Sequence, residues 1–207
     1  MTLKKLSSIL ICFLFINSSY AQNIDINILK DINLGRDRSL DGTFQFFSDS
    51  AAPVGIGAPV VIYVIGIINK DTTIKQKGLF IGEAFLASSI VTTAIKIGVK
   101  RERPFKTYPE IDDNATGGGY SFPSGHTSSV FSTATSLSIA FPKWYVIAPS
   151  FAWASAVAYS RMDLGVHYPS DVLGGIIVGS GTAYLSYKLN KWINKKSEKK
   201  YIFDGTN

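Results

Sequence analysis

Three short segments of the sequence carry side chains that could hold an anion and transfer a group. In the first segment, Lys96, Lys100 and Arg103 follow one another at intervals of four and three residues, just before Pro104. This spacing predicts a single helical stripe of three positive charges, and Pro104 is expected to end the helix. The stripe is a candidate anion site, although the helix dipole also favours positive side chains at an ordinary helix C-terminus.

The second segment, residues 122–126, has the composition of a helix start. Ser124 is a favourable N-cap residue, and Gly125 lets the backbone approach a ligand closely. The free N–H groups of a first helical turn form a cradle for an oxyanion or a phosphate. His126 lies at the same end of the predicted helix, where its imidazole could donate a proton. Taken alone, a capped helix with a histidine nearby is more often structural.

The third segment, which begins at Ser160, combines an arginine with a histidine and an aspartate. His167 and Asp171 are four residues apart. If both lie in a first helical turn, the carboxylate accepts a hydrogen bond from one imidazole nitrogen and leaves the other as a nucleophile. Arg161 adds a planar guanidinium that fits phosphate oxygens. Metal binding by the histidines with Asp163 and Asp171 is a weaker interpretation, because the sequence has no HExxH motif and no Asp-rich cluster.

Apolar segments of helical length must position these residues. Five of them are separated by polar joints, at residues 51–68, 79–97, 127–141, 145–160 and 172–189. No hairpin signal lies between them, so we predict an all-α fold, a helical bundle of five to six core helices. Residues 22–50 are polar and of mixed charge, and their apolar spacing suits a short amphipathic helix at the surface.

Charge and cysteine content exclude several classes of protein. The formal net charge is +6, but the excess lies at the two chain ends and residues 22–187 are formally neutral. This distribution argues against a nucleic-acid partner. Cys12 is the single cysteine, so disulfide redox chemistry and thiolate metal sites are excluded. With 46% hydrophobic and 17% charged residues, the 207-residue chain is too apolar for a disordered protein.

The first 21 residues have the pattern of a secretory signal peptide. Lys4 and Lys5 precede an apolar stretch over residues 9–16, and small residues follow at Ser19 and Ala21. The alternative is a retained first transmembrane helix, for which the apolar stretch is short. Either interpretation predicts export from the cytoplasm.

Segment lengths and charge indicate a membrane-spanning bundle. The first, second and last apolar segments approach the ~20 residues of a span, whereas the middle two are nearer to 15. If the helices span, twelve Lys and Arg lie with the chain ends and the joints at 69–77 and 142–143, and nine lie on the other side. The positive-inside rule makes the side with twelve cytoplasmic.

Two features of these segments bear on helix packing and on polar groups near the membrane. Gly175 and Gly179 match a small-xxx-small packing motif. Glu83 falls just inside a helix end, so we interpret it as an interfacial or hydrogen-bonding carboxylate in preference to a proton relay.

The three segments, taken in order, resemble the signature of the type 2 phosphatidic acid phosphatase (PAP2) superfamily. They are Lys96-x6-Arg103-Pro104, Pro123-Ser124-Gly125-His126 and Ser160-Arg161-x5-His167-x3-Asp171. The segments are 18 and 33 residues apart, and the resemblance covers residues 96–171 with the flanking helices. Each motif is modest alone, but the three together are specific, so the resemblance outweighs the structural interpretations of the separate segments.

The resemblance implies metal-independent phosphoryl transfer through a phosphohistidine, without a cofactor. It makes His167 the nucleophile, Asp171 the group that orients it, and His126 the acid that protonates the leaving oxygen. The residues that would hold the phosphate are Lys96, Arg103, Ser124, Gly125 and Arg161. This division is physically coherent, because phosphoryl transfer needs mainly positioning and compensation of charge on the phosphoryl oxygens.

We predict a phosphatase for a phosphate monoester or diphosphate, with a lipid as the favoured substrate, in a bacterial-type inner membrane with its site facing the periplasm. Alternatives are a soluble periplasmic acid phosphatase acting on small phosphate esters, a vanadium-dependent haloperoxidase, and a non-catalytic lipid-phosphate-binding protein. The predicted phosphatase domain covers residues 51–190, and a basic tail covers 191–207. The sequence leaves the oligomeric state open.

Overall fold

The computed structural model describes residues 23–115 and 118–204, and the predicted signal peptide lies outside these ranges. All regular elements of the described residues are helices. They are a helix over residues 23–34, the 3-10 helix η1 (Arg38–Leu40), α2 (Asp41–Asp49), α3 (Ala51–Ile68), α4 (Thr72–Val99), α5 (Pro104–Thr107), α6 (Gly125–Ala140), α7 (Trp144–Asp163) and α8 (Pro169–Asp204). The all-α prediction is confirmed, and the five apolar segments correspond to α3, α4, α6, α7 and α8.

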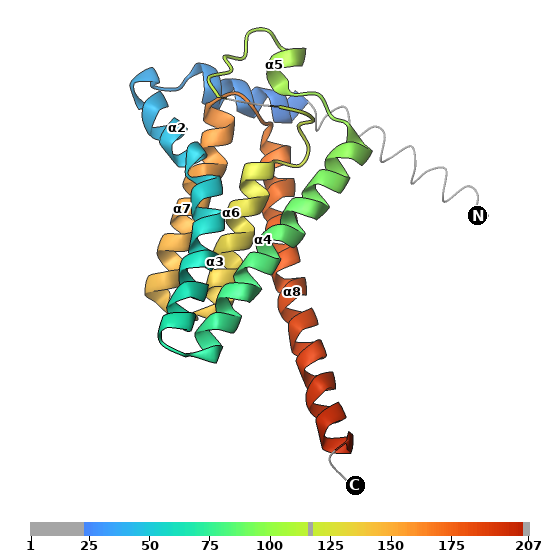
Figure 1. Ribbon diagram of the computed structural model, residues 1–207. Coiled ribbons are helices and arrows are strands. Elements are labelled where there is room, and N and C mark those ends of the chain that lie inside the picture. The colour runs from blue at the N-terminus through green and yellow to red at the C-terminus, as the bar shows by residue number, and fades with distance from the viewer. Residues whose placement is uncertain (1–22, 116–117, 205–207) are drawn as a thin grey trace, which may run out of the picture.

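The five long helices run beside one another, and α6 is the central one (Figure 1). It packs against α8, α7 and α4. Val130, Phe131 and Ala134 of α6 form one apolar core with Val157 of α7 and Val172 of α8. Small residues suit this central position, because they let neighbouring helices approach closely.

The buried hydroxyl groups of α6 explain how a helix rich in Ser and Thr can occupy the core. Ser132 Oγ donates to the carbonyl oxygen of Ala84 in α4 at 2.9 Å. Thr92 of α4 donates through Oγ1 to Ser128 Oγ at 2.7 Å. These hydroxyls are buried, but each makes a hydrogen bond to a neighbouring helix. The hydrogen bonds offset the desolvation cost of burying the hydroxyl groups.

The predicted glycine motif of α8 is confirmed as a close helix contact. A Cβ atom on Gly179 would lie 2.2 Å from the carbonyl oxygen of Ser128, and one on Gly175 would lie 2.8 Å from that of Ser124. Both contacts are with backbone of α6, which cannot give way as a flexible side chain would. The two glycines therefore set the distance between α8 and α6.

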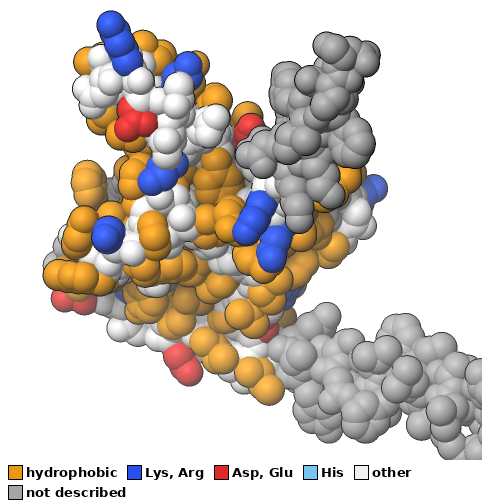
Figure 2. Space-filling view, turned by 90° about the horizontal axis from the view of Figure 1, so that it is seen from below, with side chains coloured by type: hydrophobic (Ala, Val, Ile, Leu, Met, Phe, Trp, Pro, Cys, Tyr) orange, Lys and Arg blue, Asp and Glu red, His pale blue; other side chains and the backbone are white. Residues whose placement is uncertain are grey.

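The outer surface of the bundle is apolar. Two stretches of the described residues, Arg38–Ile68 and Thr72–Thr107, are long and apolar enough to cross a membrane. Large hydrophobic side chains are exposed along the bundle, including Val61 of α3, Ile90 of α4 and Ile177 of α8. Figure 2 shows apolar side chains spread over the end of the bundle seen from below. Such a surface suits helices that face lipid.

The predicted cationic stripe is wrong. α4 ends at Val99, and its C-cap Lys100 is exposed and adopts a left-handed conformation with φ of 53°. Arg103 has an extended backbone, as expected for the residue before Pro104. Lys96 and Arg103 therefore lie on different elements, and Lys100 shares no helical face with Arg103.

The segment before α3 is more than surface structure, which corrects a second expectation. Its first helix, residues 23–34, lies across the end of the bundle near α5 (Figure 1). Leu29 and Asn33 of this helix are fully buried, and so is Ser48 of α2. Asn33 Nδ2 donates to the carbonyl oxygens of Asp163, at 2.8 Å, and Asp112, at 3.0 Å. The segment is thus fastened to the end of α7 and to the loop that follows α5.

Candidate active site

The three predicted segments meet at one end of the bundle. The end of α4 brings Lys96, the extended residues after it bring Arg103, and the start of α6 brings Ser124. The end of α7 brings Arg161, and the loop before α8 brings His167. The turns at residues 69–71 and 141–143 lie at the opposite end (Figure 1).

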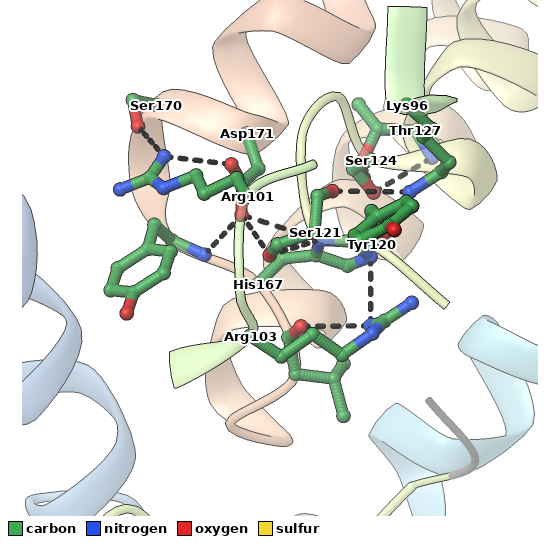
Figure 3. A network of polar contacts seen from close by, with 12 residues as sticks. Lys96, Arg101, Arg103, Tyr120, Ser121, Ser124, Thr127, His167, Ser170 and Asp171 are labelled. Atoms are coloured by element: carbon green, nitrogen blue, oxygen red, sulfur yellow. Dashed lines mark hydrogen bonds and ion pairs between the residues drawn. The ribbon is translucent and has the colours of Figure 1, made fainter. Parts of the chain in front are cut away.

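The predicted nucleophile is buried and paired with its aspartate. His167 is 1% exposed, and its Nδ1 lies 3.4 Å from Asp171 Oδ2 (Figure 3). α8 begins only at Pro169, so His167 belongs to the preceding loop and one helical turn does not form the pair. Gly165, with φ of 73°, turns this loop, and a Cβ there would lie 2.4 Å from the carbonyl oxygen of Asp112.

Asp171 can fix the tautomer of this imidazole. Its Oδ2 also accepts hydrogen bonds from Ser121 Oγ, at 2.5 Å, and from the Tyr168 N–H, at 3.0 Å. An anionic carboxylate so held favours a proton on His167 Nδ1, which leaves the lone pair on Nε2. Nε2 lies 3.3 Å from Arg103 Nη1. Burial lowers the pKa of His167 to about 3, so the imidazole is neutral, as a nucleophile must be.

Two of the predicted phosphate-binding cations are held by carbonyl oxygens. Arg103 is buried and donates to the carbonyl oxygens of Gly118, Gly119 and Val166 at 2.7, 3.1 and 2.9 Å. Lys96 Nζ donates to the carbonyl oxygens of Tyr120 and Ser121 at 2.6 and 3.1 Å. Within the described residues, neither cation has a carboxylate at ion-pair distance. Their charge is therefore available to an anion.

Arg161 adds a third cation from α7. It is 2% exposed, and its Nη1 donates to Ser48 Oγ of α2. The guanidinium is thus fixed by the segment that precedes the bundle. A buried arginine with a fixed plane suits two-point binding of phosphate oxygens.

The start of α6 has the predicted cap. Ser124 is extended and its Oγ accepts from the Thr127 N–H at 3.4 Å and from Thr127 Oγ1 at 2.9 Å. A Cβ on Gly125 would meet only Lys96 Cε, at 3.8 Å, so the protein itself does not require glycine here. The expectation that Gly125 admits a ligand stays a prediction. His126 lies in the first turn, in the field of Arg161, Arg103 and Lys96.

The PAP2 superfamily model matches residues 77–195, a range that contains all three segments. The chain belongs to the PAP2 superfamily. Undecaprenyl-diphosphatase of Sulfolobus acidocaldarius is 31% identical over 177 residues, which cover 81% of this chain and 80% of that protein. Lipid A 4'-phosphatase of Porphyromonas gingivalis is 27% identical, over 82% of this chain and 74% of that protein.

Solved structures of the PAP2 fold agree with this assignment. The crystal structure of LpxE from Aquifex aeolicus has a TM-score of 0.71 and 25% identity, and it matches over 80% of this chain and 95% of LpxE. The transmembrane PAP2-type phosphatidylglycerolphosphate phosphatase of Bacillus subtilis has a TM-score of 0.73 at 23% identity, over 90% of this chain and 96% of that one. The chain is therefore a phosphatase of the PAP2 superfamily with the fold of a membrane protein.

Sequence reasoning missed an ion-pair chain in this PAP2 phosphatase. Arg101 donates from Nη1 to Asp171 Oδ1 at 2.7 Å (Figure 3). It also donates from Nη2 to Asp25 Oδ2 at 2.6 Å. Asp25 Oδ1 also accepts from the Ser170 N–H at 2.8 Å. Asp171 thus lies between His167 and Arg101, and the helix at residues 23–34 supplies the outer carboxylate.

The sequence holds a weak signal for these ion pairs. Asp25, Leu29 and Asn33 lie four residues apart on one face of the first helix, and all three are buried. A pattern based on apolar residues alone predicts that Asp25 and Asn33 lie on the solvent-exposed face of the helix. It cannot identify polar side chains that are buried with hydrogen-bond partners. Arg101 could not be told apart from Lys100 and Arg103 either, because its buried partners Asp25 and Asp171 are far away in the sequence.

Proposed function

We propose that this PAP2 phosphatase hydrolyses a phosphate monoester or diphosphate of a lipid through a phosphohistidine, at the outer face of a membrane. The observation that carries the proposal is the environment of His167. One ring nitrogen lies against Asp171, and the other lies against Arg103 beside further cations. This arrangement leaves Nε2 as the atom that attacks phosphorus.

A lipid substrate is supported by the surface and by the relatives. The relatives carry the names undecaprenyl-diphosphatase and lipid A 4'-phosphatase, both for enzymes of phosphorylated lipids. The exposed apolar residues of α3, α4 and α8 suit a bundle surrounded by lipid. These residues disfavour the alternative of a soluble acid phosphatase, because such a protein would expose these apolar side chains to water.

The proposed reaction has two displacement steps. In the first, His167 Nε2 forms a bond to phosphorus, the bond from phosphorus to the lipid oxygen breaks, and His126 donates a proton to that oxygen. Asp171 stabilises the positive charge that develops on the ring of His167. The cations and the N-terminus of α6 compensate the charge on the phosphoryl oxygens.

In the second step, His126 takes a proton from water as the water oxygen attacks phosphorus. The bond from phosphorus to Nε2 breaks, inorganic phosphate forms, and His167 returns to its neutral state. Every bond change in both steps involves the substrate, water or the two histidines, so the proposal includes no metal.

An outward orientation is supported by the distribution of charge. The turns at residues 69–71 and 141–143 and the C-terminal end of α8 lie at the end remote from the site (Figure 1). With Lys75 and Lys77 at the start of α4, these regions carry ten Lys and Arg, against nine at the end with the site. Lys4 and Lys5, outside the described residues, complete the twelve that the sequence places on this side. By the positive-inside rule they are cytoplasmic, so the site faces the periplasm of a bacterial-type inner membrane.

The test compares lipid and soluble substrates in the presence of a chelator. Purified wild type and His167→Gln are assayed for phosphate release from undecaprenyl diphosphate, phosphatidic acid, lipid A and a small aryl phosphate. We expect metal-independent release from a lipid that is at least tenfold faster than from the aryl ester, and none from His167→Gln. Faster turnover of the small ester, or full activity of His167→Gln, would overturn the proposal.

Location and intermediate are tested separately. Activity should stay with membranes after a carbonate wash, since a soluble enzyme would be released. When wild type is mixed with substrate carrying radioactive phosphate, a label that is labile in acid and stable in base should form rapidly on the protein. His167→Gln should not acquire this label. Label that persists in His167→Gln would assign the nucleophile to another residue.

A further inference from the structure

A cavity lies at the end of the bundle remote from the candidate active site. It has a volume of about 740 Å³ and is formed by α4, the C-terminal end of α6, and α8. Asp171 and Asn190 are both on α8, nineteen residues apart. At 1.5 Å per residue they are separated by about 28 Å along the helix, which is close to the ~30 Å hydrocarbon core of a bilayer. The cavity therefore lies at the opposite membrane interface from the site.

Aromatic residues mark the same level. Trp144 and Tyr145, at the start of α7, are 78% and 60% exposed, and Trp192 of α8 is 60% exposed. Exposed Trp and Tyr concentrate where lipid headgroups meet the hydrocarbon region. Seen from this end, apolar and cationic side chains share the surface (Figure 2). The cavity thus opens where phospholipid headgroups lie.

The cavity carries charges of both signs. Lys77 and Lys191 are cationic lining residues, and Glu83 is the acidic one. Asn190 Nδ2 donates to Glu83 Oε2 at 2.7 Å, which fixes the carboxylate and leaves Oε1 able to accept a further donor. Lys77 Nζ lies 4.5 Å from the centre of the Phe141 ring, so its side chain is held at the edge of the cavity.

Most of the remaining wall is apolar or aromatic, and Thr73 and Gln76 are its polar members. It includes Leu79, Phe80, Ile139 and Tyr187, and the rings of Phe80 and Tyr187 meet edge to face with centres 6.3 Å apart. An apolar wall beside separated positive and negative groups matches a molecule that has a hydrocarbon chain, a phosphate and an ammonium group.

We propose that this cavity binds a phospholipid of the leaflet opposite the active site, with a primary amine in its headgroup, as in phosphatidylethanolamine. The phosphodiester lies between Lys77 and Lys191, the ammonium donates to Glu83, and an acyl chain covers the apolar wall. A purely anionic headgroup would place no cation on Glu83. A choline headgroup has no N–H to donate to it. The bound lipid is remote from His167, so it is not a substrate.

The test uses matched lipids on the purified, delipidated full-length protein. Apparent affinity is measured from the thermal unfolding midpoint in mixed micelles of phosphatidylethanolamine or phosphatidylcholine with identical acyl chains. A lipid that binds the folded state more tightly than the unfolded state raises that midpoint. We expect wild type to bind the ethanolamine lipid about fivefold more tightly, as one exposed charge-assisted contact of about 1 kcal/mol would give. Glu83→Gln should abolish that preference, and the double variant Lys77→Gln/Lys191→Gln should weaken both lipids.

Controls separate this proposal from its alternatives. Lys143→Gln removes an exposed lysine at the same end that does not line the cavity, and it should bind like wild type. Phosphatase activity of each variant reports folding, and native mass spectrometry of wild type counts retained lipid without any substitution. Equal affinity of wild type for the two lipids would overturn the proposal, as would tighter binding of phosphatidylglycerol. A shift by soluble phosphoethanolamine as large as that by the lipid would overturn the lipid occupant.

Discussion

Replacing Asp25 by Asn tests whether the first helix takes part in positioning the nucleophile. Asp25 accepts from Arg101 Nη2 at 2.6 Å and from the Ser170 N–H at 2.8 Å, and it is 7% exposed. Asn has the same shape without the charge, so it weakens the hold on Arg101 and exposes Asp171 to the full pull of that guanidinium. The hydrogen bond between Asp171 Oδ2 and His167 Nδ1 would then be weaker or poorly aligned.

The magnitude follows from the bonds that are lost. A hydrogen bond to a charged, largely buried group contributes about 1.5–3 kcal/mol, and Asn keeps part of it. If 1–2 kcal/mol of this reaches the transition state, kcat falls about 5- to 30-fold while KM changes little, because Asp25 touches no substrate. Steady-state phosphate release from the preferred lipid measures both constants.

The matched control lies on the same helix. Asp31→Asn removes an exposed carboxylate, and kcat should stay within twofold of wild type. A thermal unfolding midpoint that falls in Asp25→Asn with kcat unchanged would refute the positioning role and leave Asp25 a purely structural fastening. Additive losses in the double variant with Arg101→Gln would refute the coupling, since residues of one ion-pair chain must show non-additive effects.

Three further predictions concern charge, planarity and packing. Because the pKa of His167 is about 3 in the fold and near 6.5 when unfolded, the unfolded state binds more protons between these values. Stability should therefore fall by up to about 1.4 kcal/mol per unit as pH drops from 6.5 toward 3, and His167→Gln should flatten that slope in denaturant titrations. Arg103→Lys keeps the charge but loses the fork that reaches Gly118 and Gly119, and kcat/KM should drop about 10²-fold; a loss below threefold would contradict the planar role. Gly179→Ala should destabilise the protein by about 2 kcal/mol or more in thermal unfolding, whereas Gly181→Ala, whose Cβ meets nothing within 4 Å, should be neutral or stabilising.

The helices were predictable because each is a continuous segment of apolar residues, mixed in α6 with Ser and Thr, whereas the ends of the helices were less predictable. α4 begins at Thr72, seven residues before the predicted apolar segment. Asp71 caps it, accepting from the Thr73 and Ile74 N–H groups at 2.8 and 3.1 Å. The two turns that follow this cap are polar, so a criterion based on apolar runs excludes them although the N-cap signal is present in the sequence.

The functional residues divide in the same way. The three segments could be recognised because each has a local pattern, a cation before proline, a capped helix start or a histidine four residues from an aspartate. Asp25, Arg101 and Ser121 have no local pattern. Their roles depend on distances between residues that are 46 to 145 positions apart in the chain, which only the packed bundle defines.

Arg101 also accounts for how one end of the bundle can hold an aspartate beside a phosphate site. An unpaired Asp171 would repel a phosphate dianion and would raise the cost of burying both charges. Arg101 binds Oδ1 of Asp171 on the side away from His167, and Asp25 in turn binds Arg101. The carboxylate is thus compensated by a cation that is separate from those that face the substrate. In the proposed mechanism, Lys96 and Arg103 direct their charge to the phosphoryl group, and Asp171 stays anionic through the reaction, as the orientation of the His167 ring requires.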